Sequence, residues 1–86
     1  MSDTILVTGG AGYVGSHVVV ELAKAGYAPL VLDNFATSSR AVLPCLATLT
    51  GVDVPCVEAD VRDIDALRRT FHDCPITGVI HCAGLK

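Results

Sequence analysis

The sequence has few aromatic residues, few charges and no concentrated basic region. Tryptophan is absent, tyrosine and phenylalanine occur twice each, and charged residues make up 17% of the 86 positions. The six Lys and Arg residues form no run longer than two, and the nine Asp and Glu residues give a net charge of −3. This balance argues against binding to nucleic-acid phosphates through a basic patch. We therefore expect no nucleic-acid partner.

The four cysteines lack the spacing of a metal or redox site. Cys45, Cys56, Cys74 and Cys82 are 11, 18 and 8 residues apart, and no C-x-x-C pair occurs. No secretory segment is recognisable before them, so free thiols in a reducing compartment are the simplest interpretation. Each apolar run is interrupted well before the roughly 18–20 residues that a membrane span needs. We expect a cytoplasmic protein without a bound metal or a membrane segment.

Hydrophobic residues nevertheless make up 51% of the chain, which is high for its length. Eighty-six residues fall below the roughly 100–200 of an ordinary domain. A chain of this size buries only about 60–65% of its unfolded surface. The composition instead resembles that of a larger α/β protein whose strands are covered on both faces. We expect the 86 residues to be one small domain or a piece of a larger one.

Apolar runs alternate with segments of helical spacing along the chain. One helical pattern ends at Gly26, a second has Pro44 in its first turn and ends before Gly51, and a third follows Asp63 as its N-cap. We expect strands before, between and after these helices, at 4–8, 29–33, 54–58 and 78–82.

The order β-α-β-α-β-α-β predicts a parallel sheet with right-handed crossovers. Pro55 suits an outer strand, because proline cannot donate to a neighbour on both sides. In a doubly wound sheet the first three strands lie in the order 3-2-1, and the fourth lies on the far side of strand 1. We therefore expect the spatial order 3-2-1-4. The ligand site of such a nucleotide-binding half-sheet lies at the carboxyl ends of its strands.

Three glycines separate the first strand from the first helix. Gly9, Gly12 and Gly15 form G-x-x-G-x-x-G, which differs from the commoner G-x-G-x-x-G. Both spacings allow a tight turn, close approach of the backbone to a pyrophosphate, and close packing of helix on strand. The helix N-terminus also offers N–H groups and positive partial charge to phosphates. A bare turn needs only one glycine, so the pattern favours a dinucleotide site.

Acidic residues follow the second and third strands. Asp33 ends the second strand, where it can accept hydrogen bonds from the adenosine ribose and disfavour the 2′-phosphate of NADP. The alternative is an aspartate that caps a helix or faces solvent. Asp60 can pair with the adenine amino group while Val61 packs on the ring, or Asp60 can simply begin the next helix.

The segment after the fourth strand should line the middle of the cofactor. Ala83 and Gly84 are small enough for the backbone to approach a ligand, and Lys86 can bring positive charge to it. Cys82 has no identifiable base beside it, which favours a small buried hydrophobe over a nucleophile.

Four segments together resemble the start of the UDP-glucose 4-epimerases, a family of extended short-chain dehydrogenase/reductases. They are VTGGAGYVGSH at 7–17, LDN at 32–34, EADVRD at 58–63 and VIHCAGLK at 79–86. The glycine pattern is shared with related epimerases and dehydratases, whereas the final AGLK is more typical of the galactose epimerases. Cys82 departs from the pattern, since a larger apolar residue, often Phe, is usual there.

The resemblance implies that residues 1–86 form the N-terminal part of an NAD-binding Rossmann domain, with the rest of it and the substrate domain outside them. It implies NAD as cofactor, a UDP-hexose as substrate and a homodimer for the full-length enzyme. Motif and resemblance together predict cofactor contacts at Gly9, Gly12, Tyr13, Val14, Gly15, Asp33, Asn34, Phe35, Ala36, Thr37, Ser38, Asp60, Val61, Cys82, Ala83, Gly84 and Lys86.

The chemistry that the resemblance implies needs residues this chain lacks. In the family, NAD takes a hydride from C4 of the UDP-hexose, a tyrosine takes the hydroxyl proton, and the 4-keto sugar is reduced on its other face. The tyrosine belongs to a Tyr-x-x-x-Lys pair whose lysine lowers its pKa. Tyr13 and Tyr27 are followed four positions later by His17 and Val31. We therefore expect no catalytic residue and no epimerisation by these residues alone.

Two other interpretations remain open. The chain could belong to another extended family member, such as an epimerase or dehydratase that acts on a different sugar nucleotide. It could instead be a non-catalytic NAD-sensing module, which would fold and bind NAD by itself.

Overall fold

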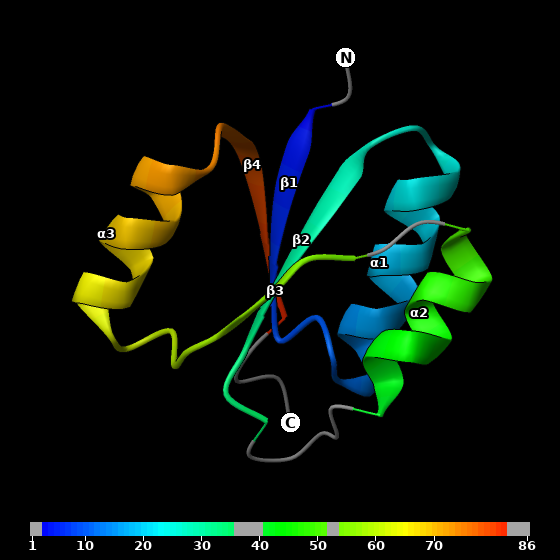
Figure 1. Cartoon of the computed structure of the whole chain (residues 1–86), viewed down its shortest axis with the longest axis horizontal. Helices are drawn as coiled ribbons and strands as arrows, with labels where there is room; N and C mark the ends of the chain where they lie inside the picture. Colours follow the sequence, from blue (N-terminus) through cyan, green and yellow to red (C-terminus); the bar gives the residue numbers. More distant parts are fainter. Residues whose placement is uncertain (1–2, 36–40, 52–53, 83–86) are drawn as a thin grey trace.

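A four-stranded parallel sheet lies between two layers of helices in this computed structural model, which describes residues 3–35, 41–51 and 54–82 (Figure 1). The strands are β1 (Thr4–Thr8), β2 (Ala28–Asp33), β3 (Cys56–Glu58) and β4 (Ile76–His81). Their order across the sheet is β3-β2-β1-β4, with β1 parallel to both of its neighbours. The expected order 3-2-1-4 is confirmed, and β3 and β4 form the two edges.

The helices divide unequally between the two faces of the sheet. Helices α1 (Tyr13–Lys24) and α2 (Val42–Thr50) cover one face, and α3 (Ile64–Asp73) covers the other (Figure 1). Because β3 and β4 are opposite edges, the connection through α3 must pass over β2 and β1. This crossover places the end of β4 beside the end of β1, where Thr8 pairs with His81.

The bounds of three strands differ from the sequence expectation, those of β2 only in starting one residue earlier, at Ala28. Strand β3 begins at Cys56, so Pro55 precedes the strand, where its carbonyl still accepts a hydrogen bond from the Val31 N–H at 2.9 Å. A proline can serve in this way because it lacks only the donor. Strand β4 occupies 76–81, two residues earlier at its start than expected and one at its end.

The two inner strands are buried on both faces, which explains the high apolar content. Val7 and Val31 pack with Val19 and Leu46 beneath α1 and α2. Their neighbours in sequence point to the other face, where the buried cluster comprises Leu6, Leu30 and Leu32. Burial of consecutive residues on opposite faces is the pattern of a covered parallel strand.

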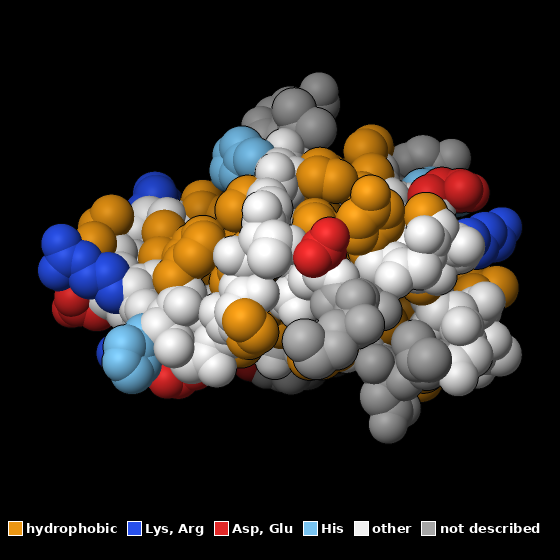
Figure 2. Space-filling view, turned by 90° about the horizontal axis from the view of Figure 1, so that it is seen from above, with side chains coloured by type: hydrophobic (Ala, Val, Ile, Leu, Met, Phe, Trp, Pro, Cys, Tyr) orange, Lys and Arg blue, Asp and Glu red, His pale blue; other side chains and the backbone are white. Residues whose placement is uncertain are grey.

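Figure 2 views the molecule from the end of the sheet at which β1 begins. Apolar side chains gather across the middle of this view, between the helical layers, and Lys and Arg side chains lie at the outer margins. Beside β4, an open apolar groove of about 490 Å³ is lined by Val14, His17, Val18, Glu21, Leu22 and Ile80. Within the described residues, no helix has the length and apolar character of a membrane span.

The helix ends follow their sequence signals. Gly26 and Gly51, just after α1 and α2, adopt φ values of 93° and 77°, which glycine tolerates at no steric cost. At the start of α3, the Asp63 carboxylate accepts a hydrogen bond from the Ala66 N–H at 3.1 Å. This bond satisfies one of the amide groups that a helix leaves unpaired at its N-terminus.

Replacing Asp63 with alanine should lower the free energy of unfolding by about 1 kcal/mol, because the cap bond to Ala66 is lost. Asp65→Ala is the matched control, since Asp65 lies in the same first turn and contributes only its charge near the helix dipole. Urea unfolding of both variants tests the cap. Equal losses in the two variants would contradict it.

Candidate functional site

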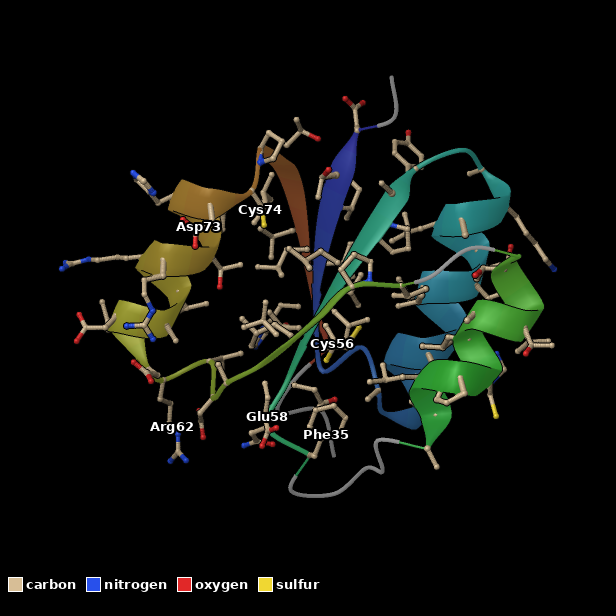
Figure 3. All side chains as sticks on the ribbon, in the orientation of Figure 1. Phe35, Cys56, Glu58, Arg62, Asp73 and Cys74 are labelled. Atoms are coloured by element: carbon tan, nitrogen blue, oxygen red, sulfur yellow. The ribbon has the colours of Figure 1, made fainter. Side chains whose placement is uncertain are left out.

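The residues singled out from the sequence gather at the end of the sheet formed by the carboxyl ends of its strands, which we call the carboxyl edge. Thr8 is level with Leu32 and with His81, and Asp33 is level with Glu58, so the four strands end together. Figure 3 shows Phe35, Glu58 and Arg62 at this edge, with Cys74 toward the opposite one. This is the edge at which open α/β sheets bind their ligands.

The turn between β1 and α1 depends on glycine at two of its three motif positions. Gly9 has a φ of 71°, and its N–H donates to the Leu32 carbonyl at 2.7 Å, which holds the turn against β2. A Cβ on Gly15 would collide with the Gly9 carbonyl oxygen and lie 2.8 Å from the Gly10 Cα. The start of α1 therefore packs against the turn too closely for any side chain.

Gly12 differs from these two because the fold does not require a glycine there. Its φ of −79° and ψ of 178° suit any residue, and an added Cβ would meet only the Gly9 carbonyl oxygen, at 3.3 Å. Gly12 is also the N-cap of α1, and no described side chain caps the first turn. The missing side chain leaves the helix N-terminus open, which suits a phosphate group.

Asp33 links the end of β2 to the glycine turn. Its carboxylate Oδ2 accepts from the Ala11 N–H at 3.0 Å, and Oδ1 accepts from the Phe35 N–H at 2.8 Å. Asp33 is only 8% exposed, so its side chain is not solvated. Its carboxylate is an acceptor group of the kind to which ribose hydroxyls can donate.

Asp60 is held by its neighbours on all of its acceptor sites. Oδ1 accepts from the Arg62 N–H at 2.8 Å and from the Arg62 Nε at 3.0 Å. Oδ2 accepts from the Arg62 Nη2 at 2.8 Å and from the Asn34 Nδ2 at 3.2 Å. The hydrogen bonds from Arg62 hold the pKa of Asp60 well below its usual range, and Asp60 in turn raises the pKa of Arg62. Asp60 does not begin α3, because the N-cap of that helix is Asp63.

A buried hydroxyl joins the ends of β1 and β4. Thr8 Oγ1 lies 2.7 Å from His81 Nδ1 and accepts from the Cys82 N–H at 3.2 Å. The Cys82 N–H also donates to the Thr8 carbonyl at 2.9 Å. Cys82 packs against the apolar cluster beneath α1, and burial raises the pKa of its thiol. This environment supports a packing role for Cys82 and a structural role for His81.

Seven residues of the expected cofactor site are connected by contacts at the carboxyl ends of the strands, namely Gly9, Gly12, Gly15, Asp33, Asn34, Phe35 and Asp60. Cys82 bonds to Thr8 at the end of β1, and Val61 packs against the cluster of Leu6, Leu30 and Leu32. The backbone of Tyr13 and Val14 belongs to the first turn of α1. The expected contacts at Ala36, Thr37, Ser38, Ala83, Gly84 and Lys86 lie outside the described residues. Within the described part of the chain, His, Cys, Asp and Glu form no group of three or more suited to a metal ion.

Three residues at this edge were not singled out from the sequence. Ala11 and Thr8 flank the glycines, so their position next to the motif was the available signal. Arg62 lies two residues after Asp60. Two side chains at this spacing reach each other only when the backbone turns between them, as it does here, where the Arg62 N–H donates to the Asp60 carboxylate. The sequence alone does not show that turn.

A parallel sheet in this order, with an open glycine turn and an acidic residue after its second strand, defines the first half of a dinucleotide-binding α/β domain. The model of the NAD-dependent epimerase/dehydratase family matches residues 5–86. The chain belongs to this family.

UDP-glucose 4-epimerases are among the proteins to which this chain is similar. That of Neisseria gonorrhoeae is 48% identical over 83 residues, and that of Bacillus subtilis is 50% identical over 82. The matches cover 96% and 95% of this chain but 25% and 24% of those proteins. The chain thus spans about a quarter of their length.

Solved structures agree with the fold. A UDP-glucose 4-epimerase from Stenotrophomonas maltophila, with bound NAD and formylated UDP-arabinopyranose, superposes with a TM-score of 0.94 at 37% identity. The enzyme from Bifidobacterium longum, in complex with NAD⁺ and UDP, gives 0.92 at 42% identity. These matches cover 98% and 96% of this chain and 25% of each enzyme.

Proposed function

We propose that this chain is the NAD-binding portion of a UDP-glucose 4-epimerase, which interconverts UDP-galactose and UDP-glucose through a 4-keto intermediate. The observation that carries the proposal is the pairing of an open Gly12 with a buried Asp33 at one edge of the sheet. The first leaves space for a pyrophosphate and the second offers acceptors to a ribose. The similarity to enzymes with bound NAD supports the same cofactor here.

The described residues fit the parts of NAD in order along this edge. The turn at Gly12 and the first N–H groups of α1, which carry positive partial charge, would hold the pyrophosphate. Asp33 would accept hydrogen bonds from the adenosine ribose, and Asp60 and Val61 would contact the adenine ring. Cys82, just after β4, would contact the middle of the cofactor. When bound, NAD supplies the acceptor for a hydride.

The catalytic part of the enzyme lies outside these 86 residues in this proposal. Neither tyrosine of the chain has a lysine four positions later, so the Tyr-x-x-x-Lys pair and the UDP-hexose site belong to the remainder of the enzyme, which we propose to be a cytoplasmic homodimer. The apolar groove between α1 and β4 supports this division over a self-contained NAD-sensing module, because a monomeric module has no need to expose it.

Titration calorimetry with NAD, combined with a coupled assay for UDP-galactose turnover, tests the proposal. We expect saturable NAD binding by the 86-residue chain and no turnover above background. Turnover by the purified chain would show that the chemistry resides within it. Absence of NAD binding by a folded chain would contradict the cofactor site.

A further inference from the structure

We propose that Arg62 is a positioning residue that gives the site its preference for adenine, by holding the Asp60 carboxylate in one orientation. This inference rests on the proposed NAD site and concerns how that site distinguishes the base. Arg62 need not touch the dinucleotide, since it acts through Asp60.

The contact between Arg62 and Asp60 fixes the carboxylate plane. The guanidinium reaches both oxygens, with Nε 3.0 Å from Oδ1 and Nη2 2.8 Å from Oδ2. A fork of two parallel bonds defines orientation as well as distance, which a lysine cannot do. The Arg62 side chain is 87% exposed and that of Asp60 29%, so the pair adds little to the stability of the fold. Its consequence is the direction of the one acceptor site of Asp60 that Arg62 does not fill, the site on Oδ2 that the Asn34 amide occupies.

Asn34 marks that acceptor site. Its amide Nδ2 donates to Oδ2 at 3.2 Å, the longest of the four hydrogen bonds to the carboxylate. The 6-amino group of adenine is also an NH₂ on a trigonal carbon, so it can replace the Asn34 amide on Oδ2 without disturbing the Arg62 fork. Hypoxanthine carries an oxygen at the same position, which places one acceptor against another. A site that pairs polar groups in this way rejects an analogue that leaves them unpaired.

Binding of NAD should therefore be compared with binding of nicotinamide hypoxanthine dinucleotide, which carries an oxo group in place of the 6-amino group and a hydrogen on the adjacent N1. We expect the native chain to prefer NAD by about tenfold or more, the effect of roughly one well-made hydrogen bond to a charged group. Arg62→Ala should reduce the preference to about twofold by weakening NAD alone. Arg62→Lys keeps the charge without the fork and should restore little of it.

Arg69→Ala is the matched control, because it removes the same charge from the exposed surface of α3. It should leave both affinities unchanged. Equal weakening of both dinucleotides by Arg62→Ala would indicate a general charge effect and overturn the positioning role, as would an unchanged preference. If the native chain binds NAD without preferring it, this inference fails and the proposed function stands. If it binds neither dinucleotide, the proposed function fails first.

Discussion

Gly15→Ala should unfold the protein, whereas Gly12→Ala should leave it folded with weakened NAD binding. At position 15 the new methyl group meets the Gly9 carbonyl oxygen and the Gly10 Cα, and both are backbone atoms that cannot rotate away. Overpacking of this kind costs about 1–3 kcal/mol or more, which is a large fraction of the stability of so small a domain. Circular dichroism during urea unfolding should show a much lower midpoint or no folded baseline.

At position 12 the same methyl group meets a single backbone oxygen at 3.3 Å, and the backbone dihedrals suit alanine. Stability should fall by no more than about 1 kcal/mol, the usual cost of alanine at an N-cap. The methyl group points to the space proposed for the pyrophosphate, so NAD affinity should drop about tenfold or more. Unchanged affinity in a folded Gly12→Ala protein would place the phosphates elsewhere.

Asp33→Ala should weaken NAD about tenfold to a hundredfold and reduce discrimination against NADP. The ribose hydroxyls lose their acceptor, and the negative charge that would repel a 2′-phosphate is gone. The variant should also lose about 2 kcal/mol of stability, because the Ala11 and Phe35 N–H groups lose their partner. Calorimetry with both dinucleotides and urea unfolding measure the two effects separately.

Asp65→Ala serves as the control for this change, since Asp65 is an exposed acid on α3. It should alter neither the affinity for NAD nor the preference over NADP. An Asp33→Ala protein that still rejects NADP would show that another group reads the 2′ position.

The sheet was predictable because its strands carry strong local signals. Consecutive apolar residues in 4–8 and 29–33 marked strands covered on both faces, and Pro55 marked the third strand as an edge. Gly26 and Gly51 located helix ends because their positive φ values favour glycine, and Asp63 located a helix start because its carboxylate caps the first turn. These signals lie within a few residues of the structure that they specify.

Which helical residues are buried was less predictable. Val14, Val18 and Leu22 share a spacing of four, yet Val14 is 51% exposed, whereas Val19, which is outside this spacing, is fully buried. On α3, Ile64 and Phe71 share the helical spacing but stay about half exposed, while Ala66 and Thr70 are buried. Burial depends on where a helix crosses the sheet, and periodicity does not encode that crossing.

The same limit applies to the site. Asp33 and Asp60 were identified by their positions after strands, but their partners depend on backbone turns. Asp33 bonds across to Ala11, which is 22 residues away, and Asn34 reaches Asp60 over 26. Contacts of this range appear only once the strands are placed side by side. The sequence therefore indicated which carboxylates matter and left open what holds them.

The position of β1 between β2 and β4 has a consequence for how the protein folds while it is being synthesised. β1 is synthesised first, but its second neighbour, Ile76–His81, leaves the ribosome only after the other described strands and helices. Until then β1, β2 and β3 can pair and α3 can cover the Leu6, Leu30 and Leu32 face, but the side of β1 that pairs with β4 stays open. Pairing over such a separation is slow to form. A nascent chain that stalls before β4 would thus expose the unpaired edge of β1 to chaperones or to other chains.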